Sequence, residues 1–150
     1  VPLAGELRVP DVNIGGTTWK PEIPDMDRIS EKIEGIMQQE ISTTEKAIEL
    51  MLFLMRGQIF YDGNKRVAQL AANQVMIQNG KGIISIPVEH QKQFFIMLVK
   101  YYETNQMDEI KEFVYENAIS GINFEKKQDK KPLSKDEFYR KKVKSIEPKL

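Results

Sequence analysis

Apolar residues recur with a helical period along most of the chain. Residues 26–37 carry an apolar side chain at every third or fourth position and follow Asp25, whose carboxylate suits the start of a helix. Residues 67–76 and 94–102 show the same period, and a last helix is predicted over about residues 107–118. The pattern therefore predicts a mainly α fold, a bundle of helices.

One of the predicted helices is apolar on every side. Ser42 and Glu45 have the Ser-x-x-Glu spacing of a capping box, in which both side chains accept backbone N–H groups at a helix start. The segment that follows contains the uninterrupted apolar run Leu50–Met55. Because a helix without a polar face must be covered all round, we expect this one to lie at the centre of the bundle.

The N-terminal segment shows a different pattern. Val12 and Ile14 precede Gly15 and Gly16, and two threonines and a tryptophan follow. Short β-forming runs on either side of a two-residue glycine turn are typical of a β-hairpin. We therefore expect a small hairpin over about residues 9–20.

Composition narrows the class of protein. The chain has 150 residues, 41% of them apolar, which predicts one globular domain and excludes disordered or collagen-like chains. It has no cysteine and only one histidine, His90, so thiol catalysis and multi-histidine zinc sites are excluded. No apolar run approaches membrane-spanning length and no signal segment opens the chain, so we expect no membrane association and a cytoplasmic location.

Charge is balanced overall but unevenly distributed. The chain has 22 basic and 22 acidic residues, and residues 125–150 hold ten of the former and five of the latter. Scattered acidic residues interrupt this basic tail, so we do not expect nucleic acid as a partner. The predicted organisation is a domain over residues 1–124 followed by a basic, poorly packed tail over 125–150, with a short helix around residues 134–144 as the exception.

A short polar loop, residues 58–66, connects two of the predicted core helices. A loop that leads into a helix start presents unpaired backbone N–H groups, which bind anions. Gly63 lets the backbone approach a phosphate, Lys65 and Arg66 supply cationic donors, and Asp62 can hold a hard cation that bridges phosphate oxygens. The alternative is an ordinary interhelical turn with an aspartate cap and basic side chains in solvent.

The residues of this loop resemble a known family. Phe60-x-Asp62-Gly63-Asn64-Lys65-Arg66 is similar to the signature of Fic/Doc (Fido-fold) proteins, H-x-F-x-[DE]-G-N-[GK]-R-x-x-R. The resemblance extends over about residues 5–120. It implies a helical bundle with a β-hairpin flap, here residues 9–20, which would present a segment of a target protein as an added strand.

The resemblance also implies a function for each loop residue. It implies binding of ATP with Mg²⁺ through Phe60–Arg66, with Asp62 at the metal, and transfer of AMP from ATP to a protein hydroxyl. Phe60 would anchor the loop on the core. The residues that it places at the nucleotide are Gly63, Asn64, Lys65, Arg66 and Gln69, and Arg66 also has a catalytic role.

The chain departs from the family pattern at two positions. Gln58 stands where the family has its catalytic histidine, and a neutral amide cannot take a proton from the attacking hydroxyl, which forfeits about 10²- to 10⁴-fold in rate. Gln69 stands in place of the second arginine, so one charge-assisted phosphate contact is lost. We therefore expect a protein adenylyltransferase fold whose activity is weak or lost, a pseudoenzyme.

Two alternatives remain open. One is an active nucleotidyl- or phosphotransferase, because Doc toxins also carry lysine at the position of Lys65 and phosphorylate their target. The other is a non-enzymatic interaction module that captures an extended peptide at the flap. Family members also carry helices ahead of the flap, so the chain is expected to expose apolar surface for a partner, a homo-oligomer or a longer parent chain.

Other candidate residues receive structural interpretations. His90 is interpreted as a surface residue with no role as a substitute base, and Trp19 as a residue that packs on its own scaffold. Ser30–Gly35 matches the family's inhibitory pattern [ST]-x-x-x-E-[GN], but this loose match is interpreted as coincidence, with Glu34 a solvated helix residue.

Overall fold

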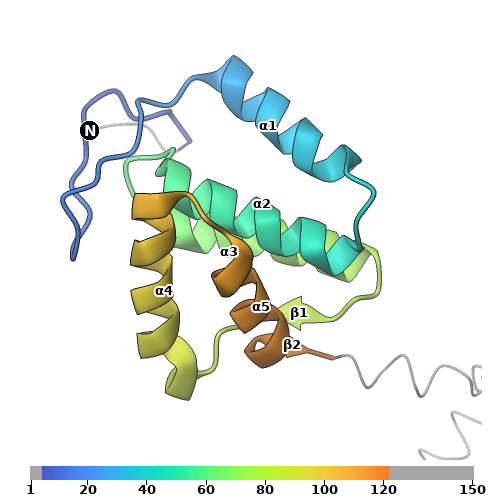
Figure 1. Cartoon of the computed structure of the whole chain (residues 1–150). Coiled ribbons are helices and arrows are strands. Elements are labelled where there is room, and N and C mark those ends of the chain that lie inside the picture. The colour runs from blue at the N-terminus through green and yellow to red at the C-terminus, as the bar shows by residue number, and fades with distance from the viewer. Residues whose placement is uncertain (1–4, 122–150) are drawn as a thin grey trace, which may run out of the picture.

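Helix α2 (Thr43–Gly57) runs through the middle of the bundle in the computed structural model, which describes residues 5–121 (Figure 1). Helices α1, α3 and α5 pack against it. Helix α4 meets its C-terminal end, where Arg56 Nε donates to the backbone carbonyl of Tyr102 at 3.1 Å. The other bounds are α1 Met26–Gln38, α3 Asn64–Gln78, β1 Ile83–Ile84, a 3₁₀ turn Val88–His90, α4 Gln91–Thr104, α5 Asp108–Asn117 and β2 Ile119–Ser120.

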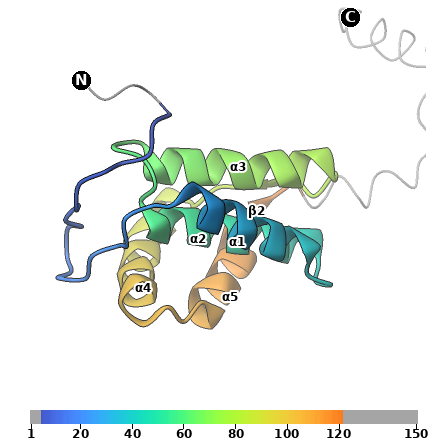
Figure 2. The ribbon, with the colours of Figure 1, turned by 90° about the horizontal axis from the view of Figure 1, so that it is seen from above.

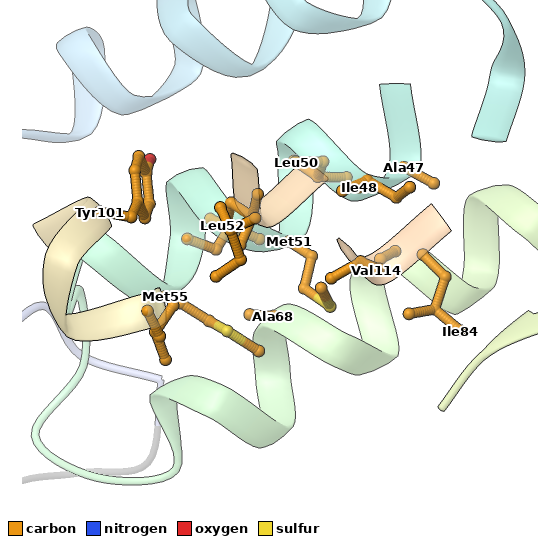
Figure 3. Packing of buried hydrophobic residues seen from close by; sticks show 14 of the residues in the cluster. Ala47, Ile48, Leu50, Met51, Leu52, Met55, Ala68, Ile84, Tyr101 and Val114 are labelled. Carbon is orange, nitrogen blue, oxygen red and sulfur yellow. The ribbon is translucent and has the colours of Figure 1, made fainter. Parts of the chain in front are cut away.

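The prediction of a mainly α fold with an apolar central helix is confirmed. Seven residues of α2 are buried, and Figure 3 shows several of them beside Ala68 of α3 and Val114 of α5. Ala68 and Ala72 are fully buried on the side of α3 that meets α2, and such small side chains let two helices approach closely. The buried residues of α2 are Ala47, Ile48, Leu50, Met51, Leu52, Leu54 and Met55.

Both predicted helix caps form. Asp25 Oδ1 accepts the N–H of Arg28 at 2.9 Å at the start of α1, and Ser42 Oγ accepts the N–H of Glu45 at 3.1 Å at the start of α2. The second half of the capping box is absent, because the Glu45 carboxylate accepts a hydrogen bond from Lys111 Nζ of α5 at 2.6 Å. An ion pair between helices therefore replaces the local contact.

The small antiparallel sheet of the fold is not formed by residues 9–20, where the hairpin was expected. It pairs β1 with β2, with Ile84 opposite Ile119. Residues 9–20 turn at Gly15 and Gly16 but form no strand. Side chains attach this segment to α4, since Thr17 Oγ1 donates to Glu103 Oε1 at 2.6 Å. Because contacts with α4 hold this segment in place, its two halves do not pair with each other.

Apolar surface remains exposed on α3. Figure 2 shows α3 along one edge of the bundle, and Leu70 and Ile77 are 70% and 64% exposed. None of the described helices is long and apolar enough to cross a membrane. The predicted tail over 125–150, with its helix around 134–144, lies outside the described residues.

An ion-pair cluster joins three helical segments. Lys111 Nζ of α5 lies 2.6 Å from Glu45 Oε1 and 2.7 Å from Glu49 Oε1 of α2. Gln39, just after α1, donates to the other oxygen of Glu49 at 2.7 Å. Burial by itself would raise the pKa of Glu49, but the hydrogen bonds from Lys111 and Gln39 and the lysine charge leave that pKa below its usual value.

This cluster predicts a pH-dependent contribution to stability. A carboxylate with a lowered folded-state pKa stabilises the fold above the unfolded pKa of about 4.3, and loses this effect as pH falls through the folded value. Glu49→Gln should therefore lower the free energy of unfolding by about 1–3 kcal/mol at pH 7, and by less at pH 3. Urea unfolding at both pH values measures the difference.

The control is Glu109→Gln, which removes the pair between Glu109 and Lys100. That pair has a similar length, 2.6 Å, but its side chains are 67% and 61% exposed. The Glu109→Gln substitution should change the free energy of unfolding by less than about 1 kcal/mol at either pH. Equal effects of the two variants at pH 7 would contradict the role of the partly buried cluster.

Candidate functional site

The loop between α2 and α3 is bounded by two residues in the left-handed backbone region. Gln58, at the end of α2, has φ 44° and ψ 53°, and Gly63, just before α3, has φ 74° and ψ 12°. These two residues reverse the chain, so that α3 returns along α2 (Figure 1). The loop lies at the end of the helix pair where the N-terminal segment passes (Figures 1 and 2).

Asn64 closes the loop from inside. Its Oδ1 accepts the N–H of Phe60 at 2.8 Å, and its Nδ2 donates to the carbonyl of Phe60, also at 2.8 Å. These bonds occupy the side-chain amide of Asn64, one of the residues predicted to lie at the nucleotide. In this structure the side chain of Asn64 therefore determines the shape of the loop.

Arg8 holds the loop from outside. It is the one buried charged residue in the described part of the chain, and its guanidinium donates to the carbonyls of Gln58, Pro10, Glu22 and Gly57. Its backbone N–H donates to the carbonyl of Ile59 at 3.0 Å. Three of these acceptors lie at or just after the C-terminal end of α2, where the helix dipole favours a cation.

Among the residues that the structure describes, no carboxylate accepts a hydrogen bond from this buried guanidinium. Burial lowers the pKa of Arg8, and the nearby Asp11 carboxylate opposes the change. An arginine remains protonated in proteins, so the charge is present at neutral pH. Backbone carbonyls therefore replace the water that would otherwise solvate it.

The first turn of α3 is open to an anion. The first intrahelical hydrogen bond runs from Val67 N–H to the carbonyl of Gly63 at 2.9 Å, and no side chain caps the helix. The N–H groups of Asn64, Lys65 and Arg66 therefore have no partner within the helix. Together with the positive end of the helix dipole, they form an arrangement that binds phosphate.

Arg66 and Asp62 flank this turn. A Cβ added to Gly63 would lie 3.3 Å from Arg66 Nη2, so the guanidinium lies over the glycine backbone. The same nitrogen is 3.6 Å from Asp62 Oδ2, and both side chains are largely exposed. Both residues are therefore free to rearrange around a ligand.

Two predicted site residues point elsewhere. Lys65 Nζ lies 4.9 Å from the ring centre of Phe95 on α4, a cation–π contact. Gln69 Nε2 donates to the carbonyl of Ile84 at 3.1 Å, so its side chain supports β1. In this conformation neither side chain is directed to the first turn of α3.

Gln58 points toward the start of α3. Its Nε2 donates to the carbonyl of Met55 at 2.7 Å, and its Oε1 lies 3.5 Å from Asn64 Nδ2. The amide oxygen therefore lies beside the first residue of α3. A side chain at this position is adjacent to the anion-binding turn.

The site supplies one carboxylate for a metal ion. Among the described residues no group of three or more His, Cys, Asp or Glu is placed to hold a metal. Asp62 Oδ1 accepts the N–H of Gly63 at 2.6 Å, and Oδ2 faces Arg66. Mg²⁺ is commonly bound by one or two carboxylates together with substrate phosphates, so Asp62 fits this ion as part of such a bridge.

Other candidates take structural positions. Trp19 packs as predicted, 5.8 Å from the ring of Tyr102 and with Arg56 stacked over it at 4.4 Å. His90 is partly buried, edge-on to Phe113 at 5.8 Å. Glu34 is exposed on α1.

One residue that holds the site, Arg8, had no role in the sequence interpretation. Arg8 stands between the apolar Leu7 and Val9, and an arginine inside a β-forming stretch is the signal that could have indicated a buried cation.

The contacts of Arg8 predict a large effect on stability. Arg8→Met keeps much of the side-chain volume but leaves several buried carbonyls without a donor, so unfolding should become easier by about 2–4 kcal/mol. Chemical denaturation measures this loss. Arg28→Met is the control, since Arg28 is 79% exposed and its pair with Glu22 is 3.7 Å long, and it should change stability by less than about 0.5 kcal/mol. Parent-like stability of Arg8→Met would show that the loop does not depend on this residue.

Comparison with known proteins relates this geometry to a family. A family model described as the Fic/DOC family matches residues 5–76. The match includes Arg8, all of α2, the whole loop after it and all but the last two residues of α3. No curated protein matches the chain. The matched residues carry the loop and the side chains that hold it, and they support assignment of the chain to the Fic/DOC family.

Proposed function

We propose that the chain binds ATP with Mg²⁺ at the first turn of α3, and that transfer of AMP to a protein hydroxyl is weak or lost. The observation that carries the proposal is the uncapped N-terminus of α3 beside Gln58. Three backbone N–H groups and the Arg66 guanidinium would receive phosphate oxygens there. Family membership supports a nucleotide as the source of these phosphates.

Asp62 would hold the magnesium ion. The ion would neutralise charge on the phosphates to which it is bound. Asp62 and Arg66 already lie 3.6 Å apart, so one residue could face the ion and the other the phosphate oxygens. Each would exchange a weak, exposed ion pair for a ligand contact.

The chemistry available at position 58 supports low activity. An amide oxygen can accept a hydrogen bond from a target hydroxyl and orient it, but it has no titratable proton acceptor near pH 7. Gln58 therefore supplies orientation without deprotonation. Arg66 would remain to stabilise negative charge on the transferring phosphate.

Residues 9–20 are positioned to guide a target. A Cβ at Gly16 would lie 3.9 Å from the ring of Phe95, the residue that also receives Lys65. The segment and the first turn of α3 thus both lie against the ring of Phe95. A target segment laid against residues 9–20 would lie close to the nucleotide site, although the absence of a strand there offers no regular edge for strand addition.

Binding of ATP should stabilise the protein. At a free ligand concentration of about 100 times Kd, a site of the folded state adds about 2.7 kcal/mol, which raises Tm by several degrees. Thermal shift with ATP and Mg²⁺ measures this. Arg66→Ala should reduce the shift strongly and Asp62→Asn should remove its Mg²⁺ dependence, whereas Lys92→Ala, which removes an exposed cation of α4, should leave it unchanged. A parent protein with no shift would exclude the proposed nucleotide site.

Restoring a base should raise activity. His enters the left-handed region more readily than most residues, so Gln58→His fits the backbone and should raise AMP transfer about 10²-fold or more. The assay is auto-modification with ATP labelled at the α-phosphate, with Gln58→His/Arg66→Ala as the inactive control. The same assay is run with ATP labelled at the γ-phosphate. If only this second label is transferred, the reaction is phosphotransfer, as in Doc proteins. A folded, ATP-binding variant that stays silent with both labels would contradict the role assigned to position 58.

A further inference from the structure

The outer face of α3 lacks the charged residues that usually cover an exposed helix. The charged residues of α3 are Lys65 and Arg66, both in its first turn, and none follows before the helix ends. Some of the remaining polar side chains are used internally, because Gln69 and Asn73 both donate to the carbonyl of Ile84 in β1. A surface helix normally turns a charged face to solvent, so the outer face of α3 is typical of one that packs against another helix.

The exposed positions of this face have the spacing of a seam between two helices. Four of them follow one another at intervals of three, four and three residues, the a/d spacing of a coiled coil. They are Val67, Leu70, Gln74 and Ile77. The half-buried Ala71 lies beside the seam, and its small side chain permits close approach of a second backbone. Figure 2 shows α3 along one edge of the bundle, with α2 and β1 packed on its other side, so within residues 5–121 no helix covers this seam.

The seam is self-complementary when two copies of α3 lie antiparallel. Val67 of one copy then faces Ile77 of the other, which pairs an a position with a d position. Leu70 faces Gln74 in the same way, and both pairs are centred on position 72, so one two-fold axis generates them all. Neither copy carries a charge on this face beyond the first turn, so like charges do not oppose the contact.

We infer that the outer face of α3 is the contact surface of a homodimer in which two copies of this helix pack antiparallel. The arrangement sets Arg66 of each copy beside the C-terminal end of the other α3, where the helix dipole favours a cation. From Val67 to Ile77 the seam spans about 15 Å of helix, which is short for a permanent interface. The dimer is therefore a reversible one. The inference concerns the chain alone and does not rest on the proposed function.

Sedimentation equilibrium of the full chain without nucleotide, from about 1 to 500 μM, tests the inference. The mean mass should rise with concentration toward that of two chains. Leu70→Glu should weaken association at least about tenfold, because it places a carboxylate of each copy in the apolar seam. Gln74→Leu should strengthen association by a similar factor, because it removes the polar member of the seam.

The matched control is Ile96→Glu, which adds the same charge at an apolar position of α4 that is 54% exposed. It should leave the association unchanged, and far-UV circular dichroism checks that each variant is folded. A chain that stays monomeric at every concentration, or equal weakening by Leu70→Glu and Ile96→Glu, would overturn the inference.

Introduced cysteines report how the two helices are aligned, because the chain has none of its own. In an oxidised mixture of the Val67→Cys and Ile77→Cys proteins, disulfides should join one variant to the other in preference to either with itself. Ala71→Cys, close to the two-fold axis, should cross-link with itself. Self-linking of all three would indicate a parallel pair and overturn the antiparallel arrangement. A monomer with NOEs between the Leu70 methyl groups and residues 122–150 would assign the face to the chain's own tail, and would also overturn the inference.

Discussion

The guanidinium of Arg8 connects the N-terminal segment to the end of the central helix, and the loop that follows that helix depends on this connection. The contact with the Gln58 carbonyl spans 50 positions of the sequence. Removing a cation from water is unfavourable, but carbonyls at the negative end of a helix provide compensating interactions. The shape of a loop of only six residues between α2 and α3 is therefore determined by a residue that lies outside both helices.

Within the loop, the polar side chains and the backbone have separate roles. Asn64 bonds both backbone groups of Phe60, and Arg8 bonds the carbonyls on the α2 side. The N–H groups of the first turn of α3 remain unbonded within the helix. Side chains thus fix the shape of the loop and leave these N–H groups available, so the proposed phosphate site would lose little conformational entropy on binding.

The helices and the loop could be predicted from the sequence because their signals are local. Asp25 and Ser42 are caps that act within one turn, and the apolar run of α2 requires burial wherever it occurs. The hairpin was predicted wrongly because a glycine turn between β-forming residues specifies a reversal of the chain but not what its two limbs contact. Contacts with α4, through Thr17 and Trp19, determine that segment.

The directions of individual side chains in the candidate site could not be predicted. Motif spacing places Asn64 and Gln69 near a nucleotide, but it does not reveal that Phe60 and Ile84 occupy their amides. Arg8 reaches the loop only through tertiary packing, and no periodic pattern marks it. The motif therefore indicated the family and the place of the site, whereas the polar network behind it required coordinates.

The left-handed backbone of Gln58 also bears on how this position can change during evolution. β-branched and bulky residues are strained at φ 44°, whereas glycine, asparagine, aspartate and histidine are tolerated. Codons for glutamine and histidine differ only in their third base. Histidine at this position is thus a single nucleotide substitution away, and the backbone already accepts it, so a titratable side chain can be introduced here without remodelling the loop.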